Sequence, residues 1–145
     1  MAAGEFRLTF KIKLVNNVGN SGMQFRSEGL PDGEAKGYQA DVGPGWWGKL
    51  YEESGRGILS NNDGEKYVKP GDWNEYEIVA DGATILTAIN GHECVNLRDE
   101  KGAKRGIFAI QLHAGGPTEV RVKDLKLEPG SGLELLTVQG AATQK

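Results

Sequence analysis

Hydrophobic and polar residues alternate one by one along most of the chain. From Phe6 to Leu14 every second residue is apolar, and the residues between them are Arg, Thr and Lys. The same period of two returns in residues 23–26, 38–42 and 110–113. Because the side chains of a strand point alternately to its two faces, this pattern predicts strands with one buried face. No stretch has a convincing helical period.

The apolar phase changes once near the end of this pattern. Val120 and Val122 keep one phase, whereas the apolar residues of 125–127 take the other. A β-bulge adds one residue to a strand and shifts its phase, so we expect a bulge near Lys123 or Asp124.

A hairpin is the clearest local prediction. Asn90-Gly91 is a favoured two-residue turn, and it separates apolar strands from Thr84 to Ile89 and from His92 to Leu97. Many short strands with glycine-containing turns predict an all-β fold, an antiparallel two-sheet β-sandwich or jelly roll. We expect one domain over residues 1–128 and a C-terminal extension or tail over 129–145.

Composition excludes several classes of partner. The net charge is -3 and there is no basic stripe, so no nucleic acid is expected. No apolar run reaches the length of a membrane span. The single cysteine, Cys94, excludes an internal disulfide, and the first residues do not form a signal peptide.

Three short motifs suggest ligands. Residues 43–48 have the glycine spacing of a dinucleotide-binding loop but no helix follows, so no nucleotide is expected. Residues 61–65 space oxygen ligands as a calcium loop does, although a surface turn is favoured, and His92 with Cys94 gives only two metal ligands. Trp46 and Trp47 form a sugar-stacking platform, or one packs into the core and the other covers a loop.

The alternation also selects a polar face. If the apolar positions face the core, the opposite face collects amides and a few ionisable groups: Gln24, Arg26, Gln39, Asp41, Lys49, Tyr51, Gln111 and His113. Such groups bind hydroxyls and move protons, although an ordinary solvated face is the alternative. The chain has no Glu-x-Asp-x-Glu run, which disfavours a conventional two-carboxylate sandwich glycosidase.

Six segments in this order resemble the 3-keto-disaccharide hydrolase domain family. They are residues 20–26, 37–41, 48–51, 70–74, 89–91 and 106–113. The resemblance implies a concanavalin-like jelly roll, export from a bacterial cytoplasm to the periplasm or beyond, and cleavage of 3-keto-glycosides or 3-keto-disaccharides by hydrolysis or elimination. A non-catalytic carbohydrate-binding module of a larger protein is the alternative, because both functions need the same polar face.

For the enzyme, the residues predict a division of roles. His113 would transfer protons and Arg26 would stabilise the oxyanion. Asp41 would orient His113, act as the base or bind a divalent metal. Substrate hydroxyls and rings would contact the remaining candidates, which are Gln24, Gln39, Tyr51, Gln111, Trp46 and Trp47.

The family resemblance also implies strands before Glu5 that this sequence lacks. Their absence would leave an open sheet edge, which invites pairing with a second copy or with other domains of a parent protein. The apolar segment Leu133 to Val138 would alternatively fold back as a strand and cover that edge.

Overall fold

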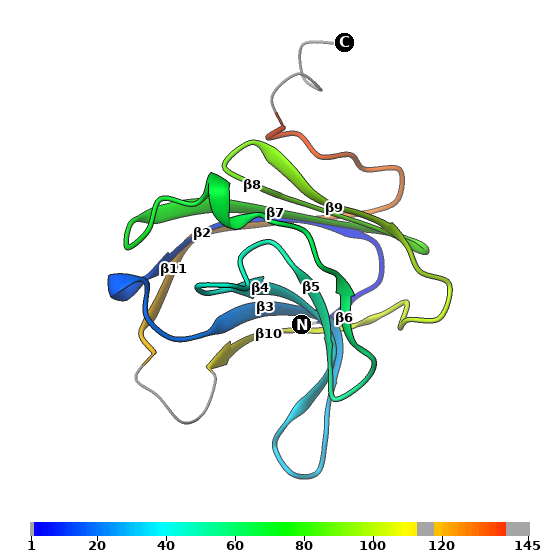
Figure 1. The fold of residues 1–145 in the computed structure, drawn as a ribbon. Helices are drawn as coiled ribbons and strands as arrows, with labels where there is room; N and C mark the ends of the chain where they lie inside the picture. Colours follow the sequence, from blue (N-terminus) through cyan, green and yellow to red (C-terminus); the bar gives the residue numbers. More distant parts are fainter. Residues whose placement is uncertain (1, 113–117, 139–145) are drawn as a thin grey trace.

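The structure, a computed structural model, describes residues 2–112 and 118–138 (Figure 1). Their strands are β1 (Ala2–Ala3), β2 (Phe6–Leu14), β3 (Ser21–Gly29), β4 (Ala35–Val42), β5 (Leu50–Glu53), β6 (Gly57–Ser60), β7 (Trp73–Asp81), β8 (Thr84–Ile89), β9 (His92–Arg98), β10 (Gly106–Leu112) and β11 (Val120–Pro129). The helical elements of this part are two single 3₁₀ turns, η1 (Val15–Asn17) and η2 (Glu65–Tyr67). No helix in it is long and apolar enough to cross a membrane.

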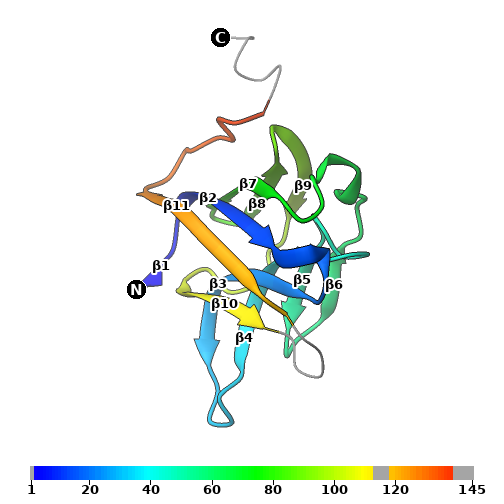
Figure 2. The ribbon, with the colours of Figure 1, turned by 90° about the vertical axis from the view of Figure 1, so that its left-hand side faces the viewer.

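The strands form two antiparallel sheets stacked face to face (Figures 1 and 2). The six-stranded sheet has the order β1-β10-β3-β4-β5-β6, and the five-stranded sheet has the order β11-β2-β7-β8-β9. The prediction of an antiparallel two-sheet β-sandwich of the jelly-roll type is confirmed.

The core lies between the sheets and consists of the apolar positions of the alternating pattern. Phe6, Leu8, Phe10, Ile12 and Leu14 are all buried along one face of β2. They meet the core faces of other strands, which contribute Met23, Phe25, Tyr38, Ala40, Val42, Tyr76, Ile78 and Ile85. Tyr76 stacks on Phe10, and its hydroxyl donates across the sandwich to the backbone oxygen of Asp41, 3.1 Å away.

Two predicted irregularities are present. Asn90 and Gly91 both have positive φ, 51° and 84°, and they join β8 to β9 as a tight turn. The register of β11 against β2 shifts between Lys123 and Lys126, and Asp124 has a φ of 55°. The predicted β-bulge therefore exists, and Leu125 within it is exposed instead of joining the core.

The C-terminal segment does not form the strand that was predicted to cover a sheet edge. Residues 130–138 form no strand and cross the outer face of the five-stranded sheet, over β7 and β8 (Figure 1). Leu135 packs there on Val79 and Ala88. The edge-covering prediction is wrong because an apolar patch on the sheet face gives Leu135 a place to be buried.

Glu77 holds this segment in place through its carboxylate. The side chain is fully buried on the outer face, where it forms a 2.6 Å ion pair with Arg7. It also accepts hydrogen bonds from the backbone N–H groups of Leu136 and Thr137 and from the Thr137 hydroxyl. A buried carboxylate requires such partners, so the sheet and the segment stabilise each other.

Two neighbouring leucines test this docking. Leu135 is 8% exposed and Leu136 is 57% exposed, so both can be changed to alanine at adjacent positions. We expect Leu135→Ala to lower the free energy of unfolding by about 2 kcal/mol, because buried leucines cost that much or more. Leu136→Ala should change it by less than about 0.5 kcal/mol. Urea unfolding measures both values, and equal effects would contradict the docked arrangement.

Candidate functional site

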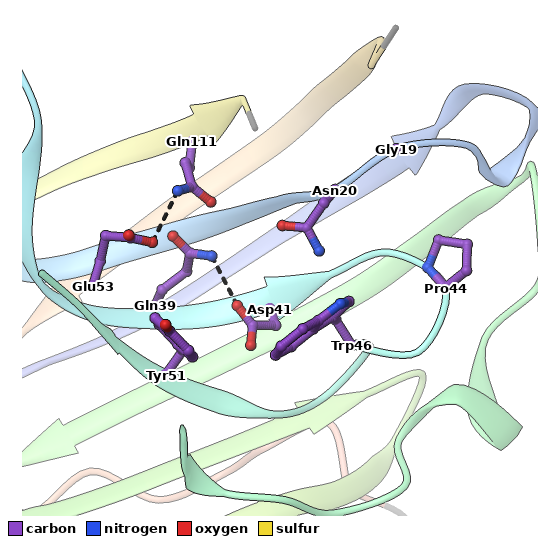
Figure 3. Close-up of a pocket in the computed structure, with 9 residues that line it drawn as sticks. All are labelled: Gly19, Asn20, Gln39, Asp41, Pro44, Trp46, Tyr51, Glu53 and Gln111. Atoms are coloured by element: carbon purple, nitrogen blue, oxygen red, sulfur yellow. Dashed lines mark hydrogen bonds between the residues drawn. The ribbon is translucent and has the colours of Figure 1, made fainter. Parts of the chain in front are cut away.

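A pocket opens on the outer face of the six-stranded sheet, on the side away from the core (Figure 3). Its volume is about 310 Å³. The lining residues come from β4, β5, β10 and the loops before β3 and after β4: Gly19, Asn20, Gln39, Asp41, Pro44, Trp46, Tyr51, Glu53 and Gln111. Three amides, two carboxylates and two aromatic rings therefore meet in one hollow.

Strand alternation brings the central residues of this pocket together. Tyr38, Ala40 and Val42 of β4 face the core, so Gln39 and Asp41 face the pocket. On β5, Leu50 is buried in the core, and Tyr51 and Glu53 lie along the pocket. Gln39 is paired in register with Tyr51, which places β4 and β5 side by side beneath the pocket.

The polar side chains are linked by hydrogen bonds. The Gln24 amide donates to Gln39 Oε1 at 3.2 Å, and Gln39 Nε2 donates to Asp41 Oδ1 at 2.8 Å. Separately, Gln111 Nε2 donates to Glu53 Oε2 at 2.9 Å. These contacts fix the amides in one orientation, so the pocket presents preorganised donors and acceptors.

Asp41 is the unusual group of the site. It is 1% exposed, and its Oδ2 has no hydrogen-bond partner among the residues described. Burial raises the pKa of its carboxyl to about 7, and the nearby Glu53 charge adds to this, against the opposing effects of the Gln39 hydrogen bond and Lys49. A carboxyl group with this pKa exchanges protons near neutral pH.

Gly22 makes room for this arrangement. It lies opposite Asp41 on the neighbouring strand β3, and a Cβ at this position would collide with the Gln39 side chain. Gln39 therefore lies flat over the backbone of β3, and any larger residue at position 22 would displace it.

The loop that carries Trp46 is tied by polar contacts to the segment that follows β6. Glu65 Oε1 accepts a hydrogen bond from the Gly45 N–H, and Asn62 Nδ2 donates to the Gly48 oxygen. Trp46 meets Tyr51 edge to face, with ring centroids 6.1 Å apart, and the Lys49 ammonium lies 5.5 Å from the Trp46 ring. Asn62 and Glu65 thus brace the loop.

Five of the predicted site residues line the pocket, namely Gln39, Asp41, Tyr51, Gln111 and Trp46. Gln24 lies next to them, bonded to Gln39. Trp47 does not join them, because it is 2% exposed in the core and its ring N–H donates to Asn17. The two tryptophans therefore divide between the core and the pocket. His113 lies outside the described residues.

The expectation that Arg26 shares this surface is wrong. Arg26 is 1% exposed, and its guanidinium donates to the backbone oxygens of Gly4 and Gly82. Gly82 belongs to the turn between β7 and β8, so Arg26 reaches across to the other sheet. The cause is a break in alternation, because Arg26 has a φ of 49° and the β3–β4 register shifts just after Phe25.

Sequence reasoning missed Glu53 and Asn20. Glu53 is two residues beyond Tyr51, so extending the alternation along β5 by one more step would have included it. Asn20 precedes β3 in a loop, where no periodic pattern assigns a direction.

A metal site finds no support in the part of the chain that is described. No three His, Cys, Asp or Glu residues there are placed to hold a metal ion. His92 and Cys94, the candidate pair on β9, have other surroundings. The His92 ring stacks on Tyr67 with ring centroids 4.2 Å apart, and burial raises the pKa of the Cys94 thiol to about 11. Glu65 is bonded to the Trp46 loop instead.

The sequence matches a family model, described as the 3-keto-alpha-glucoside-1,2-lyase-like domain, over residues 2–128. The chain belongs to this family. The resemblance found in the sequence is therefore confirmed. The family is carbohydrate-related, and this chain is a 3-keto-glucoside lyase-like domain. No curated protein matches the sequence.

Solved structures agree on the fold. Two proposed glycosyl hydrolases from Parabacteroides distasonis ATCC 8503 each superpose with a TM-score of 0.67, at 16% and 19% identity. The alignments cover 90% and 89% of this chain and 74% and 80% of theirs. The carbohydrate-binding module CBM66 from Bacillus subtilis superposes with a TM-score of 0.63 at 15% identity, covering 88% of this chain and 77% of the module.

The Asp41 carboxyl provides a test through pH. Its pKa of about 7 in the folded domain exceeds the value of about 4 in an unfolded chain. Between these values the folded domain holds a proton that the unfolded chain releases, so this group makes stability fall as pH rises from about 4 to 7. The slope is up to about 1.4 kcal/mol per pH unit.

Asp41→Asn removes this titration. We therefore expect the free energy of unfolding of the variant, minus that of the wild type, to rise across the same pH window in urea titrations. Asp63→Asn, at an exposed carboxylate with no side-chain partner in the described part, controls for loss of one charge. A difference for Asp41→Asn that is flat with pH would contradict the assignment.

Proposed function

We propose that this domain cleaves 3-keto-glycosides in the pocket around Asp41, by elimination followed by hydration. The observation that carries the proposal is the Asp41 carboxylate, which is buried, has a pKa of about 7 and has an Oδ2 without a partner in the described residues. The family match supports the substrate class, and we propose an exported protein for the same reason.

The chemistry needs one base and several hydrogen-bond donors. A carbonyl at C3 acidifies the proton on C2, and its removal leaves an electron pair that moves into the carbonyl as an enolate. When the carbonyl re-forms, that pair makes a C1–C2 double bond, and the bond from C1 to the glycosidic oxygen breaks. The oxygen leaves with the electrons of that bond and takes a proton, and water can then add to C1.

Asp41 is the group suited to take the C2 proton. Its Oδ1 accepts a hydrogen bond from Gln39, and Oδ2 has no partner among the described residues, so Oδ2 is the oxygen that we assign to the proton transfer. At a pKa of about 7 the carboxylate is basic enough to accept a proton, and the resulting acid can return it to the leaving oxygen.

The remaining pocket residues suit binding. The amides of Asn20 and Gln39 offer donors for sugar oxygens, and Glu53 accepts from hydroxyls while it is held by Gln111. Trp46 supplies an indole ring at the rim, against which the apolar face of a sugar can pack.

A non-catalytic binding module is the second candidate. The pairing of Glu53 with Gln111 favours this candidate. It leaves Asp41 as the one carboxylate in the described pocket with an unpartnered buried oxygen, so no second carboxylate there is free to share the acid–base work. A module needs only the amides and the aromatic rings, whereas the enzyme also needs the proton transfer of Asp41.

Asp41→Asn separates these functions. Asparagine keeps the shape and the Gln39 contact but cannot accept a proton, so cleavage of a 3-keto-glycoside should fall at least about 100-fold. Asp63→Asn should cleave like the wild type. Release of the leaving alcohol measures the rate, and calorimetry with the unoxidised glycoside measures binding.

The outcomes are distinct. A wild type that binds glycosides but never cleaves the keto form would establish the binding module and reject the enzyme. Full cleavage by Asp41→Asn would show that another group is the base.

A further inference from the structure

A second hollow lies on the opposite side of the sandwich, on the outer face of the five-stranded sheet. Its volume is about 430 Å³, and its walls include Lys11, Lys69, Trp73, Glu75, Lys123 and Thr137. A neighbouring hollow of about 360 Å³ shares Lys11 and Glu75 with it. Two adjacent hollows along a sheet face suit a chain-like ligand better than a single small molecule.

The charge of this hollow is opposite to that of the whole chain. Three lysines face one glutamate in it, although the net charge of the chain is -3. Of these lysines only Lys11 has an ion pair within the described residues, a 3.5 Å contact with Asp124 in which both side chains are about half exposed. Lys69 and Lys123 lie within 4 Å of no carboxylate oxygen that is described. The hollow therefore concentrates unneutralised positive charge.

Register brings these cations together. Lys123 of β11 pairs with Lys11 of β2, and Lys11 pairs with Glu75 of β7, so three adjacent strands present charged groups on one line. Trp73 lies at the start of β7, and the Lys123 ammonium is 4.2 Å from its ring centroid. This cation–π contact holds the lysine over the ring instead of in free solvent.

We propose that this face is a second carbohydrate-binding site, for polysaccharides whose sugars carry carboxylates. The lysines would pair with the carboxylates, while Glu75 would accept hydrogen bonds from the hydroxyls. Lys123 covers one face of Trp73, where a nucleobase would otherwise stack, so the hollow suits a carboxylate-bearing sugar better than single-stranded nucleic acid.

This site is independent of the proposed cleavage. Its strand residues, Lys11, Trp73, Glu75 and Lys123 among them, belong to the other sheet from Asp41, and no residue of this hollow lines the first pocket. The domain could thus be held on an acidic polymer by one face while the other face stays open to a second sugar.

Calorimetry with an oligogalacturonate on the full chain tests the proposal. We expect binding that weakens as salt is added, and that falls about tenfold or more in the Lys69→Ala, Lys123→Ala double variant. Lys36→Ala, at an exposed lysine on the other sheet, and Trp46→Ala should both bind like the wild type. Thermal melts check that each variant folds.

Two further probes define the ligand class. The same oligosaccharide with its carboxylates reduced to alcohols should not bind, and single-stranded poly(dT) should bind more weakly than the oligogalacturonate. No binding of the oligogalacturonate at low salt would overturn the proposal, as would poly(dT) binding of equal strength. An equal loss in Lys36→Ala would show a general charge effect and no site.

Discussion

The pleat of strand β4 is the constraint on which both the core and the pocket depend. One face of this strand gives Tyr38, Ala40 and Val42 to the core, and the other gives Gln39 and Asp41 to the pocket. Both sets are almost fully buried, so a slip of one residue would place a carboxylate and an amide between the sheets. Tyr76 reinforces the register from the opposite sheet, because its hydroxyl binds the Asp41 backbone oxygen.

The two outer faces of the sandwich use buried charge in different ways. Asp41 has an oxygen without a partner in the described residues, and the pKa of its carboxyl is raised. On the other face, Glu77 is equally buried but accepts bonds from Arg7 and from the C-terminal segment. A satisfied carboxylate stabilises an arrangement, whereas an unsatisfied one retains reactivity, so of these two groups Asp41 is the one suited to proton transfer.

Alternation made most of the fold and much of the pocket predictable. It correctly assigned Gln39, Asp41 and Gln111 to one face, although Gln111 is distant in sequence from the other two, because pairing of adjacent strands preserves the pleat. It failed at Arg26, where a positive φ in β3 turns the side chain toward the other sheet. It also failed for residues 130–138, since the patch that receives Leu135 exists only after β7 and β8 have paired. The role of His113, outside the described residues, stays a prediction.

Gly22 has a consequence for attempts to redirect this domain to other sugars. The floor of the pocket depends on the absence of a side chain at Gly22, since Gln39 occupies the volume that a Cβ at this position would need. Substitutions in the floor would therefore disturb the whole chain of hydrogen bonds from Gln24 to Asp41. The rim is separate, because Trp46 lies on a loop anchored by Asn62 and Glu65. New specificity can be sought by varying that loop while the floor around Asp41 is kept constant.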